Sequence, residues 1–217
     1  MKLRIASLTL LLLALVTIPA MAQTLYSNGN TNGNTDAWTI NFGFIVSDQF
    51  NLTANSAITG ASFAMWVEPG DTLESAELSL TSGENSGTTY YNQVVDFSQS
   101  GCVLNSYDYD VCKESTTNFS TTIANAGAYW LNLQNAVTSE GEPIYWDENS
   151  GPAHGSENSV GTIPSESFTV LGSESSTTST TTSTSTSTTT TVPEPSSIML
   201  FGSGILGLAG MLRRKLF

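Results

Sequence analysis

The sequence has very little positive charge. Six Lys and Arg residues stand against nineteen Asp and Glu residues in 217 residues, which gives a net charge of -13. Lys113 is the only Lys or Arg between Gln23 and Val192, because the other five lie near the two ends of the chain. Eighteen carboxylates against this one cation give the stretch a net charge of -17. Such a surface repels phosphate groups, which excludes nucleic-acid binding.

Histidine is almost absent, which restricts the catalytic chemistry open to the chain. The one histidine, His154, lies in the segment GPAHGSE, where Gly and Pro predict an exposed loop. A Ser-His-Asp triad would need this residue, yet the sequence contains no G-x-S-x-G motif. We therefore identify no catalytic residue in the sequence and expect a non-enzymatic protein.

Only two cysteines are present, Cys102 and Cys112, both in the segment GCVLNSYDYDVC. In an oxidising compartment, a disulfide that closes this short loop is the expected state. A metal site or free thiols are the alternatives, but zinc would need further Cys or His ligands. A disulfide across a loop of this length stabilises an unstrained fold by about 3 kcal/mol.

The N-terminus predicts export. Lys2 and Arg4 precede an apolar run from Leu8 to Ile18, and small residues for a signal peptidase follow before Gln23. This is the pattern of a secretory signal peptide over residues 1–22. The Sec translocon and signal peptidase are therefore expected partners, and an oxidising compartment is the expected destination.

Sustained helical periodicity is missing between the two terminal apolar segments, and alternation of apolar and polar residues takes its place. Apolar residues occupy every second position in three segments, at Trp38–Val46, Ala61–Val67 and Ala76–Leu80. Further strands are expected at 88–97, 117–124, 128–137 and 167–171. About eight short strands of this kind predict an all-β domain over residues 23–172, an antiparallel, jelly-roll-like β-sandwich.

Residues 173–192 are almost entirely Ser and Thr. A segment without apolar side chains buries too little surface to offset the entropy of ordering it, which predicts a disordered linker. Its hydroxyl groups also suit an O-glycosylated stalk. Ice binding by arrayed threonines is disfavoured, because the run lacks the alternating apolar residues that would hold it flat as a strand.

The C-terminal segment, residues 193–217, has three parts in order. Pro193, Glu194 and Pro195 come first, an apolar segment at 198–212 follows, and the basic residues are Arg213, Arg214 and Lys215. The apolar segment predicts one transmembrane helix, about 22 Å long at 1.5 Å per residue. Basic residues after it place the chain's end on the cytoplasmic side.

This tail resembles the PEP-CTERM sorting signal of exported proteins from Gram-negative bacteria, a tail that also carries the label "ice-binding protein C-terminal" domain. The resemblance implies an exosortase, a membrane cysteine protease, as a processing partner. It also implies a single-pass intermediate in the inner membrane, followed by delivery to the cell envelope or the extracellular space, where such proteins are associated with exopolysaccharide. The segments LYSNGN, AWTINFGF, WVEPGD, AYWLNLQNA, YWDENSGP and IPSESF further resemble a group of PEP-CTERM proteins with a β-sandwich body. That second resemblance implies no activity.

Two acidic segments are candidates for ligand or metal binding. The segment YWDENSGP, expected as a loop, combines an aromatic face with polar acceptors that suit a glycan or calcium; its candidate residues are Tyr145, Trp146, Asp147, Glu148 and Asn149. Asp108 and Asp110 are candidate calcium ligands in SYDYD. A structured turn with Asn and Asp side-chain caps is the alternative in each case, and the Asn-rich segment at 28–33 is expected to be such a turn.

These features together predict an exported envelope or matrix protein with a structural or adhesive role. A contact with an exopolysaccharide or with calcium is part of this hypothesis, and no other cofactor is expected. A secreted carbohydrate-active enzyme is the alternative, for which Asp147 and Glu148 would be the acid and base. Adjacent residues on a strand point to opposite faces, however, which disfavours such a pair.

Overall fold

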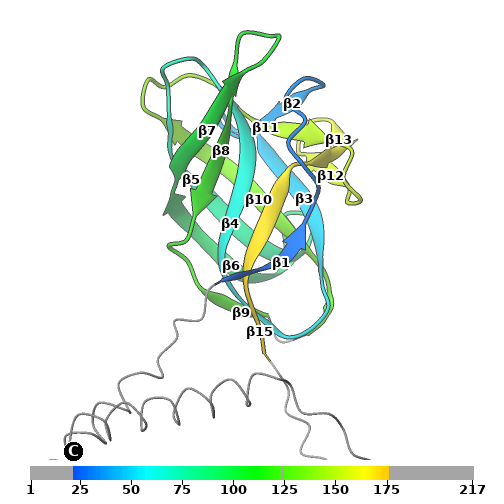
Figure 1. The fold of residues 1–217 in the computed structure, drawn as a ribbon. Coiled ribbons are helices and arrows are strands. Elements are labelled where there is room, and N and C mark those ends of the chain that lie inside the picture. Colours follow the sequence, from blue (N-terminus) through cyan, green and yellow to red (C-terminus); the bar gives the residue numbers. More distant parts are fainter. Residues whose placement is uncertain (1–21, 124, 176–217) are drawn as a thin grey trace, which may run out of the picture. The chain divides into compact units, whose positions relative to one another are not determined.

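The alternating segments build two antiparallel sheets that face each other across an apolar core (Figure 1). This computed structural model describes residues 22–123 and 125–175, which contain fifteen β-strands and no helix. The prediction of an all-β, antiparallel sandwich is confirmed.

The first sheet, sheet A, has β4 at its centre. Its strands are β1 (Gln23–Ser27), β15 (Phe168–Glu174), β4 (Ser56–Val67), β11 (Ile144–Asn149) and β14 (Ser165–Glu166), with β2 (Ala37–Thr39) on β11, β8 (Asp110–Thr116) and β9 (Thr121–Ile123) on β4, and β7 (Ser98–Leu104) on β8. The second sheet, sheet B, is β13 (Gly161–Ile163), β12 (Gly155–Glu157), β3 (Ile45–Leu52), β10 (Gly127–Thr138), β5 (Leu73–Gly83) and β6 (Ser86–Asp96), in that order.

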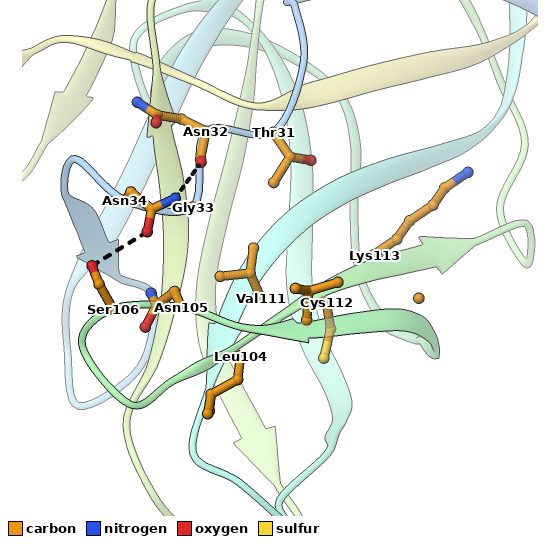
Figure 2. A pocket seen from close by; sticks show the side chains of 12 residues that line it. Thr31, Asn32, Gly33, Asn34, Leu104, Asn105, Ser106, Val111, Cys112 and Lys113 are labelled. Carbon is orange, nitrogen blue, oxygen red and sulfur yellow. Dashed lines mark hydrogen bonds between the residues drawn. The ribbon is translucent and has the colours of Figure 1, made fainter.

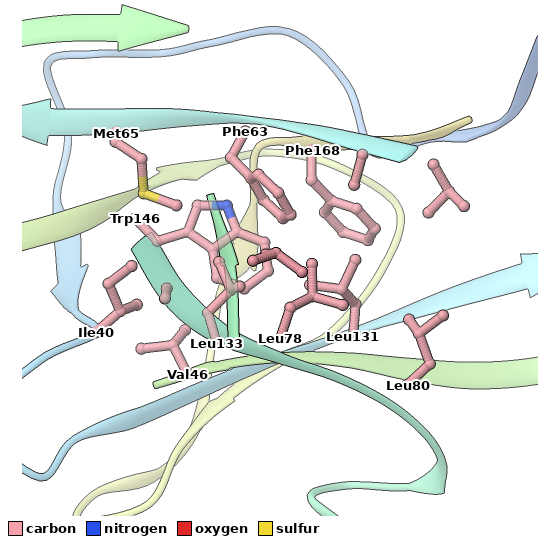
Figure 3. Packing of buried hydrophobic residues seen from close by; sticks show 14 of the residues in the cluster. Ile40, Val46, Phe63, Met65, Leu78, Leu80, Leu131, Leu133, Trp146 and Phe168 are labelled. Carbon is pink, nitrogen blue, oxygen red and sulfur yellow. The ribbon is translucent and has the colours of Figure 1, made fainter. Parts of the chain in front are cut away.

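The core lies between these sheets and is filled by the residues that alternation predicted (Figure 3). Phe63 and Met65 of β4 and Leu78 and Leu80 of β5 are all buried. Trp146 packs edge-on against Phe63, with ring centroids 5.3 Å apart. Since each such side chain contributes about 1.5–3 kcal/mol when it is removed from water, this layer is the main source of stability.

The predicted strand at Trp38–Val46 is wrong, because a turn interrupts it. β2 ends at Thr39 and β3 begins at Ile45. Between them, Phe42 and Gly43 have positive φ values of 55° and 92°, and the Phe44 N–H donates to the Asn41 carbonyl at 3.1 Å. Phe42 is consequently 66% exposed. The pattern of apolar residues continues through the turn, but the extended backbone does not.

Several predictions fall outside the described residues: all but the last residue of the signal peptide, most of the Ser/Thr linker, the apolar segment 198–212 and the basic residues after it. Within the described ranges, no helix is long and apolar enough to cross a membrane. The last strand ends at Glu174, two residues beyond the predicted end of the sandwich domain.

The turn can be tested by comparing two substitutions. We expect Ile40→Ala to lower the free energy of unfolding by about 2–5 kcal/mol, because Ile40 is fully buried. Phe42→Gly should be neutral or stabilise by up to about 1 kcal/mol, because glycine adopts a positive φ without strain. Urea denaturation measures both. Equal losses from the two variants would instead support a continuous strand at 38–46.

Candidate functional site

The loop between β1 and β2 is the centre of a hollow surface. Thr31 lines three pockets, of about 350, 470 and 210 Å³. Together, the pockets are lined by the loop itself, by the β7–β8 hairpin, by the segment after β11, and by parts of β4, β8 and β15; residues that recur among them are Gly29, Asn30, Asn32 and Lys113. Because the pockets share these walls, we treat them as one groove, the Thr31 groove.

The pocket of about 350 Å³ lies between the loop and the β7–β8 hairpin (Figure 2). The Ser106 hydroxyl of the hairpin donates to Asn34 Oδ1 at 3.3 Å and joins the two walls. Asn105 shapes the hairpin end, because its Oδ1 accepts the backbone N–H groups of Tyr107 and Tyr109 at 2.9 and 3.0 Å. The pocket therefore has amide and hydroxyl groups on both sides and apolar side chains, Val103 and Leu104 among them, beside these groups.

The predicted disulfide between Cys102 and Cys112 is confirmed. It joins β7 to β8 on either side of the segment that lines the pocket. The cross-link thus limits how far the two strands of the hairpin can separate.

Asp147 fixes the middle of the loop between β1 and β2. This side chain is fully buried, and its two oxygens accept three hydrogen bonds: from the Asn32 N–H at 2.8 Å, the Gly33 N–H at 2.7 Å and Trp66 Nε1 at 2.7 Å. Burial raises the pKa of Asp147, and the bonds from Trp66, Asn32 and Gly33 oppose that rise. Asp147 is thus committed to the fold and does not lie free in the groove.

The expectation that YWDENSGP is a loop is wrong for its first part. Residues 145–149 belong to β11, which pairs with β4 and with β2. Trp146 is fully buried in the core and offers no face to a ligand. Glu148 accepts a hydrogen bond from Trp38 Nε1 at 3.2 Å. Asn149 Nδ2 donates to the carbonyls of Asn28 and Asn30 at 2.7 and 3.2 Å, so it supports the groove loop.

An aromatic group lies beside the hairpin, and of its four members only Tyr145 was among the predicted site residues. Trp66 stacks on Tyr107 at 5.6 Å, with 22° between the rings, and lies 6.0 Å from Tyr109. Tyr109 in turn meets Tyr145 edge-on at 5.5 Å. Tyr107 is 54% exposed and presents an aromatic surface to solvent. The spacing of the tyrosines in SYDYD was the available signal, but the prediction used only the two acids of that segment.

Those two acids, Asp108 and Asp110, lie at the end of the β7–β8 hairpin. Asp108 has a positive φ of 66° in the turn, and Asp110 begins β8 opposite Leu104. In the described part of the chain, no group of three or more His, Cys, Asp or Glu residues could hold a metal ion. Calcium binding by this pair stays a prediction. His154 lies exposed before β12, in the loop expected for it.

Removing the Asp147 carboxylate should destabilise the fold far more than removing the carboxylate of Glu148. Asp147→Ala leaves three donors without an acceptor, two of them buried, and we expect a loss of about 3 kcal/mol or more in the free energy of unfolding. Glu148→Ala removes one hydrogen bond and should cost about 1 kcal/mol. Chemical denaturation of both variants measures the difference. Similar small losses would contradict a structural role for Asp147.

Comparison with known proteins identifies one feature, a sorting motif at the end of the chain. No curated protein matches the chain. Residues 191–215, which lie outside the described residues, match the PEP-CTERM protein-sorting motif. The match includes Pro193, Glu194 and Pro195 as well as Arg213, Arg214 and Lys215. The chain therefore carries the PEP-CTERM sorting tail of an exported protein, which passes through the membrane to the cell envelope and has an exosortase as its processing partner.

Proposed function

We propose that the exported domain is a non-enzymatic, glycan-binding component of the cell envelope or extracellular matrix, and that the Thr31 groove is its contact surface. One observation carries this proposal. Eighteen carboxylates lie between Gln23 and Val192, yet none of the residues that line the three pockets is Asp or Glu. The lining includes Lys113, the single cation of that stretch.

The polar, carboxylate-free lining suits sugar hydroxyl groups. Amide side chains both donate and accept hydrogen bonds, as a sugar hydroxyl does. Asn30, Asn32, Asn34 and Asn105 provide such amides. Glycan sites commonly add an aromatic face on which a sugar ring can lie, and Tyr107 is exposed at the end of the same hairpin. An extended groove with these groups supports a polysaccharide as the ligand more than a small molecule.

The missing carboxylates also bear on the alternative, a carbohydrate-active enzyme. Glycoside hydrolysis usually requires two carboxyl groups that flank the scissile bond. Asp147 and Glu148 were the residues considered for these roles. Asp147 is engaged in three hydrogen bonds and Glu148 in one. This arrangement favours binding over hydrolysis.

The groove can be tested with a glycan array and calorimetry on the secreted protein, with neutral and uronic-acid polysaccharides. Thr31→Trp should abolish binding, because the indole would fill the point that the three pockets share. Tyr107→Ala should weaken binding about two- to tenfold through loss of an aromatic contact. Phe42→Ala is the matched control, since Phe42 is also exposed but does not line the groove.

Each outcome of this experiment decides a point. Lys113→Gln should weaken binding only if the bound glycan is acidic. Runs with calcium and with a chelator test the expected calcium contact. Absence of binding to every glycan in both conditions, or equal binding by the wild-type protein and Thr31→Trp, would refute the proposed function.

The sorting tail gives a separate test in the cell. Replacing Pro193 and Pro195 by Ala should leave the protein in the inner membrane, because the exosortase would no longer process it. Membrane fractionation and immunoblotting measure the outcome, with Pro69→Ala in the β4–β5 turn as the control. Release of the double variant at the normal rate would argue against processing at this motif.

A further inference from the structure

Two buried acidic residues, one from each sheet, are joined by a backbone hydrogen bond. Asp48 lies on β3 of sheet B and Glu166 on β14 of sheet A, and both side chains are fully buried. The Glu166 N–H donates to Asp48 Oδ2 at 2.5 Å. Asp48 Oδ1 and both carboxylate oxygens of Glu166 are buried without a hydrogen-bond partner. Three acceptors without donors are costly unless a proton or a cation lies among them.

No cation is available within the described residues to neutralise this pair. The titratable groups that act on Glu166 are Asp48, Glu148, Asp147 and Asp36, all of them acids. The other titratable group near Asp48 is the phenol of Tyr26 on β1, which is uncharged near neutral pH and interacts electrostatically with Asp48. The only Lys or Arg in the described ranges is Lys113, which is exposed and lines the groove. The one histidine, His154, is exposed as well. A second negative charge would therefore have no counterion.

The surroundings favour the protonated forms. Burial, as the largest effect, raises the pKa of Asp48 to about 7, although hydrogen bonds from Glu166, Gln49 and Ser165 lower it in part. Burial and the neighbouring carboxylates, Asp48 first among them, raise the pKa of Glu166 well above its ordinary value. Near neutral pH, at least one of the two groups therefore keeps its proton.

The pair also holds the start of the groove loop. Asn28 is fully buried, and its Nδ2 donates to Asp48 Oδ2 at 3.1 Å and to the Glu166 carbonyl at 2.7 Å. Tyr26 donates its hydroxyl hydrogen to Asn28 Oδ1 at 2.8 Å. The same Nδ2 group also donates to Ser165 Oγ, the residue before Glu166. Separation of Asp48 from Glu166 would therefore pull apart the acceptors that hold Asn28, and with them one anchor of the loop.

We propose that Asp48 and Glu166 retain a proton between the two sheets, and that its loss to solvent at alkaline pH drives the carboxylates apart, releases Asn28 and disorders the Thr31 groove. The proposed function is needed only for the consequence that glycan binding weakens as pH rises. The proton-dependent anchor itself can be tested without any glycan.

The direction of the pH effect follows from the raised pKa values. A carboxyl group whose pKa is higher in the folded than in the unfolded chain contributes stability that is fully present below the unfolded value, about 3.9 for Asp. That stability is lost as pH rises through the pKa of the group in the folded protein. This pKa is about 7 for Asp48 and is raised well above its ordinary value for Glu166. The unfolding equilibrium constant should rise by up to about tenfold per pH unit for each such group.

The test combines two measurements on the full exported chain. Urea denaturation between about pH 5 and pH 8.5 gives the global effect, and hydrogen exchange of the Asn32 and Gly33 amides, corrected for the intrinsic rate, gives the order of the loop. In the wild-type protein, both stability and amide protection should fall as pH rises. Asp48→Asn and Glu166→Gln should make both stability and amide protection depend less on pH, because the side-chain amides that replace the carboxyl groups cannot ionise.

Glu114→Gln is the matched control. Glu114 on β8 is also fully buried, and burial raises its pKa to about 7, but it makes no contact with Asn28 among the hydrogen bonds of the described residues. Its replacement should make the free energy of unfolding depend less on pH and leave the pH dependence of the loop's hydrogen exchange unchanged. If the variants at Asp48 or Glu166 do not fold, the infrared band of a protonated carboxyl group in the wild-type protein decides the question: it should be present at pH 6 and disappear at alkaline pH.

The outcomes separate this inference from the proposed function. Loop exchange that is independent of pH, or no protonated carboxyl band, would overturn the proton-dependent anchor even if glycans bind. Stability at alkaline pH that depends on added calcium would also overturn it, in favour of a cation between the carboxylates. A pH-dependent loop in a protein that binds no glycan would refute only the proposed function.

Discussion

The structure depends on acidic groups that are buried without a positive partner. In the exported part of the chain, one lysine accompanies eighteen carboxylates, so ion pairs cannot stabilise the fold there. Asp147 instead accepts three hydrogen bonds from backbone and indole N–H groups, and Asp48 accepts them from Asn28 and Glu166. Hydrogen bonding and protonation thus take the place of charge pairing. Both Asp147 and Asp48 hold the loop between β1 and β2.

This arrangement explains why a loop rich in Asn and Gly can form a defined surface. Such a segment has little apolar area to bury and would be mobile by itself. Here Asn28 and Asn149 fix its start, Asp147 fixes its middle at Gly33, and Ser106 of the disulfide-linked hairpin contacts it through Asn34. The amide and hydroxyl groups that remain are held in place on a carboxylate-free surface. A preorganised, carboxylate-free groove on an acidic domain is consistent with a protein that is sorted to the envelope and, as proposed, binds polysaccharide there.

Much of the sandwich could be predicted from period-two alternation. Ala76, Leu78 and Leu80 and the apolar residues of β4 lie in the core as expected. Alternation failed at Phe42, because a polar-apolar pattern does not reveal two successive residues with positive φ. It also missed the short polar strands β12 to β14, whose residues are fixed by pairing with distant strands and not by local preference.

The site was less predictable than the fold. Asp147 and Asn149 were predicted as candidate ligand-binding residues, whereas in the structure they support the loop through partners more than 100 positions away. The Asn-rich segment at 28–33 was expected to be a turn; it forms an irregular loop, and its place in the groove follows only from the way β11 and the β7–β8 hairpin lie beside it. Asp48 and Glu166 gave no sequence signal, because neither lies in a motif and both owe their properties to burial.

Chemical-shift mapping of the ¹⁵N-labelled exported protein with polysaccharide fragments tests the central claim most directly. At mildly acidic pH, the account predicts that shifts concentrate at Thr31, Asn32, Gly33 and Asn34 and in the β7–β8 hairpin, and that they weaken at alkaline pH as the loop loses order. Shifts confined to sheet B, or shifts at the groove that do not change with pH, would contradict it.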